Sequence, residues 1–467
     1  MIPVTTFAGK RVAVFGLGGS GLATASALAA GGADVVVWDD NSGRVQGAVE
    51  TGLKAQDLRD VDFSTLAALI LAPGVPLTHP KPHWTADKAQ AANVEIIGDI
   101  ELFCRERAAH APDSPFIAIT GTNGKSTTTA LIAHILKQAG RSVEMGGNIG
   151  TAILSLAPAA PGRIHVVECS SYQIDLAPGL APSVGVLLNV SPDHLDRHGT
   201  IENYAAIKAR LIIKSDAAVV GIDDRFSAQA ADAVEATSRQ LTRLGIRNPV
   251  SRGIMLQDSW LMETIDGTAS KLFELSLAPN LRGAHNAQNA AAAFAVCRYC
   301  GLKDSEIATG LRSFPGLVHR METIAQEGRI RLVNDTKATN ADAAERALLS
   351  FDHIYWIAGG VPKSGGIADL ADHFPRIAKA YLIGEAREQF AATLKGHVPA
   401  ELFDSLEEAT SAAIRDARND AAADITVLLS PACASFDQFS NFEQRGDAFR
   451  TAVFSHLSND EMLGDQS

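Results

Sequence analysis

The sequence predicts an α/β fold with mainly parallel sheets and three domains in series, at residues 1–103, 104–315 and 316–467. At 467 residues the chain is longer than one hydrophobic core usually serves. Short apolar runs alternate with helical segments, a pattern typical of parallel sheets covered by helices on both faces. The alternation restarts after a polar, proline-containing stretch that begins near residue 104, and again after residue 315, which sets the predicted boundaries.

Composition and charge narrow the class of protein. The chain is 46% hydrophobic and 20% charged, as in an ordinary globular enzyme. Its 41 basic residues against 53 acidic ones give a net charge of −12, which disfavours a nucleic-acid partner. Small anionic substrates remain compatible with local basic groups. We expect a monomer that takes small-molecule substrates.

The cysteines and the first apolar segment indicate the cellular compartment of the protein. Five scattered cysteines do not form a disulfide framework, and the C-x-x-C at Cys297 and Cys300 lies on an alanine-rich, predicted helical segment. The uncharged run from Val12 to Ala33 contains six glycines and lacks the continuous leucine-rich stretch of an export or membrane segment. These features predict a cytoplasmic chain without membrane insertion.

The first domain opens with a strand, a glycine turn, a helix and a second strand. Gly16, Gly18 and Gly21 form G-x-G-x-x-G, and Asp39 ends the second strand, which is the Rossmann-like dinucleotide pattern. Glycines at such a turn admit any phosphate to the N–H groups of the helix start. A nicotinamide cofactor and a UDP diphosphate therefore both remain possible.

The second domain begins with the strand 116–120, followed by GTNGKST and a helix. This is the arrangement of a P-loop-type phosphate cradle, in which Lys125 reaches the phosphates and a hydroxyl of Ser126 or Thr127 binds Mg²⁺. Ile119 stands where the common P-loop has its first glycine.

Two polar residues follow later strands of this domain. Glu168 ends the strand near residue 165, and His194 comes just after the next strand. Because ligands bind at the carboxyl edge of a parallel sheet, these side chains are placed to hold a metal beside ATP phosphates. His194 and His198 stand four apart, but a loop position with one thiol nearby disfavours zinc.

The remaining motifs are polar clusters at expected strand or helix ends. Asn286 and Asn289 stand three apart at a predicted helix start, where one can cap the helix. In the third domain, also predicted to be Rossmann-like, the clusters follow strands and are suited to anions. They are Asp335, Thr336, Lys337, Thr339 and Asn340; Lys363; and Ser435, Asp437, Asn441 and Arg445. Each single member can instead be a cap or a turn residue.

These motifs together resemble the Mur ligases, the ATP-dependent amino-acid ligases of peptidoglycan precursor synthesis. GTNGKST, SPDHLDRHG and the asparagine pair match in kind and order over the whole chain, and the family's loop form explains Ile119. NDTKATN and LLSPACASFDQFSNFEQRGDAF look like the member that adds D-glutamate.

The resemblance implies a reaction and its participants. UDP-N-acetylmuramoyl-L-alanine would be joined to D-glutamate through an acyl phosphate, with ATP and two magnesium ions. It also implies site residues. For ATP they are Gly121, Thr122, Asn123, Gly124, Lys125, Ser126, Thr127, Asn286, Asn289, Arg320 and Asp335; for the UDP substrate Gly18, Ser20, Asp39, Asp40, Gly74 and Asn148; for D-glutamate Thr339, Lys363, Ser435 and Phe442; for metal Ser126, Glu168, His194 and Lys208; and for catalysis Lys125, Glu168, His194 and Lys208.

Lys208 is the residue for which pattern and resemblance disagree. The helical pattern around it reads as a solvated surface lysine. The resemblance implies instead that CO₂ carbamylates it, so that a carboxylate supports the second magnesium ion.

Three other functions remain possible from the sequence alone. They are a nicotinamide-dependent oxidoreductase, a P-loop protein that uses ATP as a conformational switch, and a related ligase for another amino acid. The stretch 223–270 carries no motif beyond a mixture of helix and hairpin.

Overall fold

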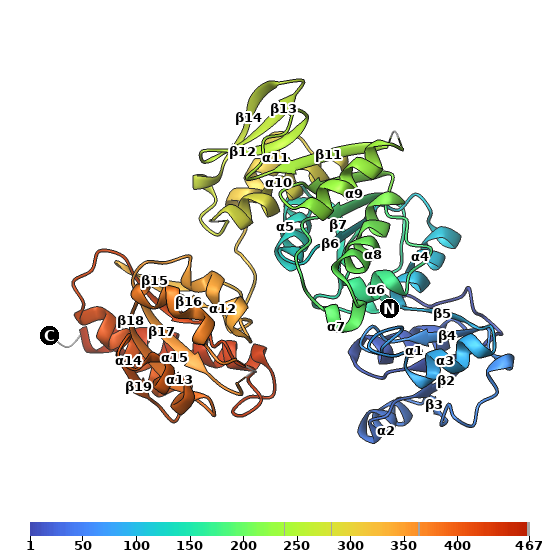
Figure 1. The fold of residues 1–467 in the computed structure, drawn as a ribbon, viewed down its shortest axis with the longest axis horizontal. Coiled ribbons are helices and arrows are strands. Elements are labelled where there is room, and N and C mark those ends of the chain that lie inside the picture. Colours follow the sequence, from blue (N-terminus) through green and yellow to red (C-terminus); the bar gives the residue numbers. More distant parts are fainter. Residues whose placement is uncertain (238, 282, 363–364, 465–467) are drawn as a thin grey trace. The chain divides into compact units, whose positions relative to one another are not determined.

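The computed structural model describes residues 1–237, 239–281, 283–362 and 365–464. The chain separates into two compact units, Met1–Phe314 and Pro315–Ser467, which contain three sheets in sequence order. The predicted α/β class with mainly parallel sheets is confirmed (Figure 1). The domain boundaries at residues 103 and 315 stay a prediction.

The first sheet is parallel throughout, in the order β3-β2-β1-β4-β5. Alternate residues of β1 face opposite cores, because Val12 and Val14 join one apolar cluster and Ala13 and Phe15 the other. Its elements are β1 (Arg11–Phe15), α1 (Gly19–Ala30), β2 (Asp34–Trp38), α2 (Ser42–Glu50), β3 (Lys54–Ala55), η1 (Phe63–Thr65), β4 (Ala68–Leu71), α3 (Trp84–Ala91) and β5 (Glu95–Ile97).

The second sheet has the order β14-β13-β12-β11-β10-β9-β6-β8-β7. It is parallel from β7 to β12, and β13 and β14 add an antiparallel meander. Its strands are β6 (Phe116–Thr120), β7 (Ser142–Gly147), β8 (Arg163–Glu168), β9 (Val184–Leu187), β10 (Ala217–Gly221), β11 (Gln240–Gly245), β12 (Gly253–Gln257), β13 (Trp260–Ile265) and β14 (Thr268–Glu274). The stretch 223–270 is thus helix α9 followed by β11 and hairpins, as expected.

Helices cover both faces of the second sheet. Side chains of α5, α10 and α11 belong to the core on one face, and those of α8 and α9 to the core on the other. The elements are α4 (Asp99–His110), α5 (Lys125–Gln138), η2 (Ile153–Ser155), α6 (Ser171–Asp175), α7 (Leu195–His198), α8 (Ile201–Ile213), α9 (Arg225–Glu235), η3 (Leu275–Leu277), α10 (Ala284–Tyr299) and α11 (Asp304–Ser313). Cys297 is buried inside α10, as the helical reading of the C-x-x-C predicted.

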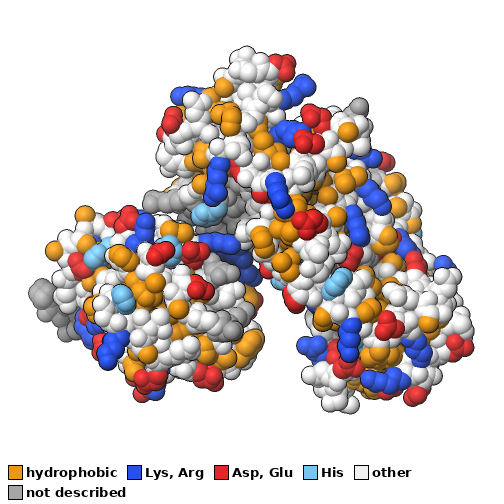
Figure 2. Space-filling model, in the orientation of Figure 1, with side chains coloured by type: hydrophobic (Ala, Val, Ile, Leu, Met, Phe, Trp, Pro, Cys, Tyr) orange, Lys and Arg blue, Asp and Glu red, His pale blue; other side chains and the backbone are white. Residues whose placement is uncertain are grey.

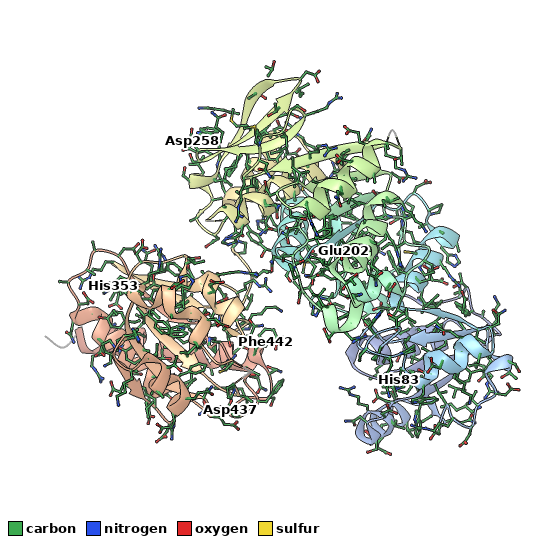
Figure 3. The ribbon with its side chains drawn as sticks, viewed as in Figure 1. His83, Glu202, Asp258, His353, Asp437 and Phe442 are labelled. Atoms are coloured by element: carbon green, nitrogen blue, oxygen red, sulfur yellow. The ribbon has the colours of Figure 1, made fainter. Side chains whose placement is uncertain are left out.

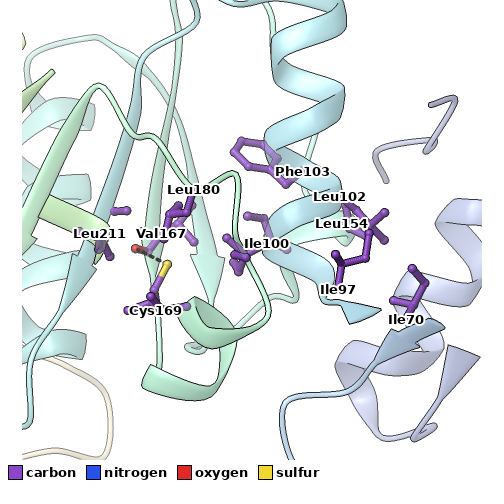
Figure 4. Packing of buried hydrophobic residues seen from close by; sticks show 14 of the residues in the cluster. Ile70, Ile97, Ile100, Leu102, Phe103, Leu154, Val167, Cys169, Leu180 and Leu211 are labelled. Carbon is purple, nitrogen blue, oxygen red and sulfur yellow. Dashed lines mark hydrogen bonds between the residues drawn. The ribbon is translucent and has the colours of Figure 1, made fainter. Parts of the chain in front are cut away.

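One apolar core joins the first and second sheets. Helix α4 follows β5 directly and runs across residues 103 and 104, so a helix connects the sheets at this place. Figure 4 shows Ile70 and Ile97 of the first sheet, Ile100 and Phe103 of α4, and Val167 of β8 within this cluster. The two sheets of the first unit therefore share buried surface.

The third sheet has the order β15-β16-β20-β17-β18-β19, antiparallel only between β15 and β16. Helices α12 and α13 pack on one face and α14 and α15 on the other. Its elements are β15 (Glu322–Glu327), β16 (Ile330–Asn334), α12 (Ala341–Leu348), β17 (Ile354–Gly359), η4 (Ala368–Arg376), β18 (Ile377–Ile383), α13 (Arg387–Leu394), β19 (Ala400–Leu402), α14 (Leu406–Asn419), β20 (Ile425–Leu429) and α15 (Phe442–Gly464).

The surface carries charges of both signs. Figure 2 shows Lys and Arg side chains lying among Asp and Glu on the visible face of each unit. Among the described residues, no helix combines the length and apolar character that crossing a bilayer requires.

Phe103 tests the shared core of the first unit. Its side chain is 1% exposed and packs edge-on against Phe116 with ring centroids 5.0 Å apart. Phe103→Ala should lower the free energy of unfolding by about 3–5 kcal/mol, because it leaves a cavity. Urea denaturation measures the change, with Val49→Ala on the exposed face of α2 as the control. Equal stabilities of the two variants would contradict the shared core.

Candidate functional site

The loop between β6 and α5 has the geometry of an anion cradle. Gly124 adopts a left-handed φ of 84°, and a Cβ there would lie 2.4 Å from Asn289 Oδ1, so the position requires glycine. Lys125 Nζ donates to the carbonyls of Gly121 (2.9 Å) and Thr122 (2.8 Å). The N–H groups at the start of α5 thus border a glycine turn whose carbonyls bind the Lys125 ammonium, and phosphate binding by this loop stays a prediction.

Asn189, which sequence reasoning missed, holds this loop in place. Its Oδ1 accepts from the N–H of Asn123 at 2.9 Å, and its Nδ2 donates to Gln288 Oε1 at 2.8 Å. Its carbonyl accepts from the N–H of Thr122 at 2.8 Å. The signal was a polar residue just beyond β9, the strand that pairs with β6.

Asn286 and Asn289 lie beside the loop, on the first turns of α10. Asn289 Oδ1 accepts from Thr128 Oγ1 at 3.0 Å, and Asn289 Nδ2 donates to Asn286 Oδ1 at 3.0 Å. The expectation that one of them caps the helix is wrong, because the cap is Gly283 without a side-chain bond. Their amides instead connect α10 to α5.

Glu168 contributes a buried carboxylate next to the loop. It pairs in register with Ile119 of β6 and is 2% exposed. Oε1 accepts from Asn148 Nδ2 at 2.8 Å, whereas Oε2 is buried and has no hydrogen-bond partner among the described residues. A buried carboxylate oxygen without a partner is costly, and a bound cation would satisfy it.

Lys208 is buried next to the start of the loop. Its side chain is 1% exposed, and Nζ donates to the Gly121 carbonyl at 2.9 Å and to Thr120 Oγ1 at 3.3 Å. The reading of a solvated surface lysine is wrong, since α8 packs this face against β6. Burial, followed by the neighbouring charge of Lys125, holds the pKa of Lys208 well below its ordinary value.

The two histidines of the loop after β9 differ in environment. His194 caps α7 with a left-handed φ of 52°, and its side chain is 49% exposed, with Nε2 3.4 Å from Asp193 Oδ2. His198 is buried, bonded to Ser171 Oγ at 2.9 Å and stacked on Tyr172. Within the described ranges, no group of three or more His, Cys, Asp or Glu side chains is arranged to hold a metal.

In the first sheet, the Asp39 carboxylate accepts hydrogen bonds from nearby backbone N–H groups. Its oxygens accept from the N–H groups of Leu17 at 2.6 Å and Asn41 at 2.8 Å, which fixes the glycine turn against the end of β2. Gly16 has a φ of 93°, and a Cβ at Gly21 would lie 1.8 Å from the Gly16 carbonyl. These glycines are required by close backbone approach.

The other predicted residues of the first sheet surround this turn. Asp40 is half exposed and lies 3.3 Å from His83, which Figure 3 labels. Gly18 is the N-cap of α1 and has open space at its Cβ position, and Ser20 is in the first turn. Gly74 accepts a bond from Arg197 of α7 at 3.0 Å, so the loops of the two sheets meet here.

In the second unit, Asp335 is a buried carboxyl just after β16. It accepts from Ser430 Oγ at 2.9 Å and from the N–H of Met321 at 3.1 Å. Burial raises its pKa to about 7, opposed by these bonds and by the charge of Arg320.

The described residues that are predicted to bind D-glutamate lie on the loops at the carboxyl edge of the third sheet. Ser435 is 2% exposed after β20, and Thr339 lies between β16 and α12. Phe442 begins α15, with Lys337 Nζ 4.7 Å from its ring centroid (Figure 3). Asp437 accepts from the N–H of Glu385 at 3.1 Å and thereby supports a turn. Lys363 lies outside the described residues.

Comparisons with known proteins agree with this geometry. Residues 119–297 match the Mur ligase middle domain, and residues 319–433 match the Mur ligase, glutamate ligase domain. The chain is 60% identical over 449 residues to the UDP-N-acetylmuramoylalanine–D-glutamate ligase of Rhizobium meliloti (strain 1021), covering 96% of this chain and 97% of that protein. It is 57% identical over 466 residues to the protein of the same name from Chelativorans sp. (strain BNC1), covering 100% of both.

A solved structure shares the fold at a much lower sequence identity. The UDP-N-acetylmuramate-alanine ligase of Thermotoga maritima superimposes with a TM-score of 0.57 at 17% identity, covering 95% of this chain and 99% of that one. The three-domain α/β architecture is therefore shared with remote relatives.

Asp335 predicts a pH dependence of stability in the second unit. Because its folded pKa of about 7 exceeds the ordinary value of 3.8, its contribution is full below pH 3.8 and is lost as pH rises through 7. Asp335→Asn should therefore flatten the fall in stability between pH 4 and 8, by at most about 4 kcal/mol. Thermal unfolding across this range measures it, with the exposed Asp369→Asn as control. Parallel curves for wild type and Asp335→Asn would contradict the assignment.

Proposed function

The chain belongs to the Mur ligase family, and from this premise we propose that it joins D-glutamate to UDP-N-acetylmuramoyl-L-alanine while ATP becomes ADP and phosphate. Relatives that carry this activity in their names are 57–60% identical to it over nearly the whole chain. The observation that carries the phosphoryl-transfer half is the buried Glu168 Oε2 beside the glycine loop, which has no hydrogen-bond partner among the described residues.

The proposed reaction has two steps. The L-alanine carboxylate oxygen attacks the γ-phosphorus of ATP, the bond to ADP breaks, and an acyl phosphate forms. The amine of D-glutamate then attacks the acyl carbon, loses a proton, and phosphate leaves as the amide forms. Both steps move negative charge among phosphate and carboxyl oxygens, so fixed cations and oriented N–H donors lower the barriers.

The loop of the second sheet supplies those groups in the proposal. Lys125 and the N–H groups of 121–127 bind the ATP phosphates. Magnesium would be held by Ser126, Glu168, His194 and a carbamylated Lys208, and it would neutralise phosphate charge. The orphaned Glu168 oxygen fits such a cation, and the half-exposed imidazole of His194 is accessible to one. Hydrogen-bonding amides Asn286 and Asn289 lie next to the same loop.

Most of the substrate-binding residues are assigned to the other two sheets, and Asn148 directly follows β7 of the second sheet. The glycine turn of the first sheet would hold the uridine nucleotide, through Gly18, Ser20, Asp39, Asp40 and Gly74, while Asn148 contacts the muramoyl-alanine part. Thr339, Lys363, Ser435 and Phe442 would bind D-glutamate, and Arg320 and Asp335 the nucleotide. Backbone N–H groups and cations at strand ends are suited to bind the two carboxylates of D-glutamate.

Lys208 is proposed to carry a carbamate. The neutral amine nitrogen attacks the carbon of CO₂, an N–H proton leaves to water, and the neutral side chain becomes an anionic carbamate. Complete burial against Gly121 favours the neutral amine and keeps the product out of bulk water. Proximity to the charged group of Lys125 adds to this preference.

The remaining assignments complete the proposal. We place the three domains at residues 1–103, 104–315 and 316–467, and a monomeric enzyme in the cytoplasm, where ATP and UDP-linked precursors are available. The five cysteines are free thiols, as suits a reducing compartment.

The amino-acid specificity can be measured directly. Phosphate release with ATP, Mg²⁺ and UDP-N-acetylmuramoyl-L-alanine should depend on D-glutamate within a panel of amino acids, with the product confirmed by mass. Dependence on another amino acid would keep the ligase chemistry but overturn the glutamate assignment. No turnover with any amino acid would contradict the proposed function and would favour an oxidoreductase or a switch protein instead.

Lys208→Ala should reduce turnover by roughly 100-fold or more, because the metal support is lost. Formate or acetate should restore part of the activity by replacing the missing carboxylate. Wild-type protein under ¹³CO₂ should show a carbamate carbon signal that the variant lacks. Lys214→Ala, at the end of the same helix, is the control. Full activity of Lys208→Ala, or no carbamate signal in the wild type, would refute the modification.

A further inference from the structure

Arg445, in the first turn of α15, is a buried guanidinium bonded only to neutral oxygens. It is 1% exposed. Nε donates to Thr336 Oγ1 at 2.9 Å, and Nη2 donates to the carbonyls of Thr336 at 3.1 Å and Cys433 at 3.0 Å. Nη1 donates to the carbonyls of Ala434 at 3.3 Å and Gly359 at 3.4 Å. All N–H donors of the guanidinium are thereby used.

Arg445 makes no ion pair with a described residue, and the charge of Asp437 raises its pKa only from further away. None of its hydrogen-bond acceptors is a carboxylate. Burial lowers its pKa to about 10, so it stays a cation at neutral pH. Burying a charge without an ion-pair partner is unfavourable for folding, and an apolar residue would avoid that cost. Stability alone therefore does not account for an arginine here.

The segments that Arg445 connects are those that carry the proposed glutamate-binding residues. Thr336 precedes Thr339 in the β16–α12 turn, and Ala434 precedes Ser435. Gly359 ends β17, and Phe442 begins α15, three residues before Arg445. One side chain thus links three strand-end loops to the start of α15.

Two glycines allow this close approach. At Gly360, which has a φ of 128°, a Cβ would lie 2.2 Å from the Ala434 carbonyl and 3.0 Å from Arg445 Nη1. At Gly446 a Cβ would lie 2.2 Å from His319 Nδ1. The backbone around the guanidinium is therefore shaped to bring α15 against the strand ends.

We propose that Arg445 is a positioning residue of the amino-acid subsite, which fixes the loops that bind D-glutamate and supplies a buried positive charge that the dicarboxylate matches. The inference rests on the proposed function. Because all its donors are used within the protein, Arg445 acts through the loops and through its field, not by direct contact with the substrate.

The test separates KM values for the three substrates in Arg445→Met, Arg445→Lys and wild type. KM for D-glutamate should rise roughly 10- to 100-fold in Arg445→Met, because displaced loops misplace their donors. Arg445→Lys keeps the charge with at most three bonds, so its KM should fall between the two. KM for the UDP substrate should stay within about twofold, since its proposed residues lie in the first unit.

Arg418→Met is the matched control. Arg418 lies in the same unit but bonds Glu327 Oε2 near the amino edge of the sheet, and so has a carboxylate partner. Its loss should lower the melting temperature without changing KM for D-glutamate.

Three outcomes are decisive. An unchanged KM for D-glutamate in both Arg445 variants, or in Arg445→Lys when Arg445→Met does not fold, overturns the inference. A parallel rise of all three KM values, as general loosening would produce, overturns it as well. A wild-type protein that does not use D-glutamate refutes the proposed function itself, which distinguishes the two failures.

Discussion

The burial of the Lys208 amine against the carbonyl of Gly121 is the constraint on which the site of the first unit depends. It places α8 against the end of β6 and brings a basic nitrogen close to the glycine loop and to Glu168. Two buried features therefore lie near one loop: an amine of lowered pKa, and a carboxylate oxygen that has no hydrogen-bond donor among the described residues. Neither feature stabilises the folded state, and both are typical of a site that binds anions and cations close together.

Features that follow from local sequence could be predicted. The strand at 116–120, the glycine turns and the loop before α5 depend on residues a few positions apart, and the structure has them where the sequence places them. The carboxyl-edge positions of Glu168 and Asp335 follow from the parallel sheet alone. Local patterns also produced the incorrect helix cap at Asn286 or Asn289, because the helix begins earlier, at Ala284.

Contacts between distant segments could not be predicted in the same way. Asn189 binds a loop 66 positions away, and Arg445 binds Thr336 over 109 positions. In the sequence Asn189 looks like an ordinary turn residue. Arg445 is one member of a polar cluster after a strand, and the sequence does not give its partners. Asp39 shows the reverse case, since a position typical of ribose binding also accepts two backbone N–H bonds of its own turn. Residue type and spacing identify a place in the sheet, whereas tertiary packing decides which partner a side chain takes.

The helix that runs across residues 103 and 104 has a consequence for folding. Since α4 and the strands on either side bury their apolar side chains in one core, the first and second sheets should open and close together as one foldon. Their amide protons would then exchange with similar protection. A fragment cut at residue 103 would end inside a helix and expose half of this core to water, which favours aggregation over an autonomous mini-domain.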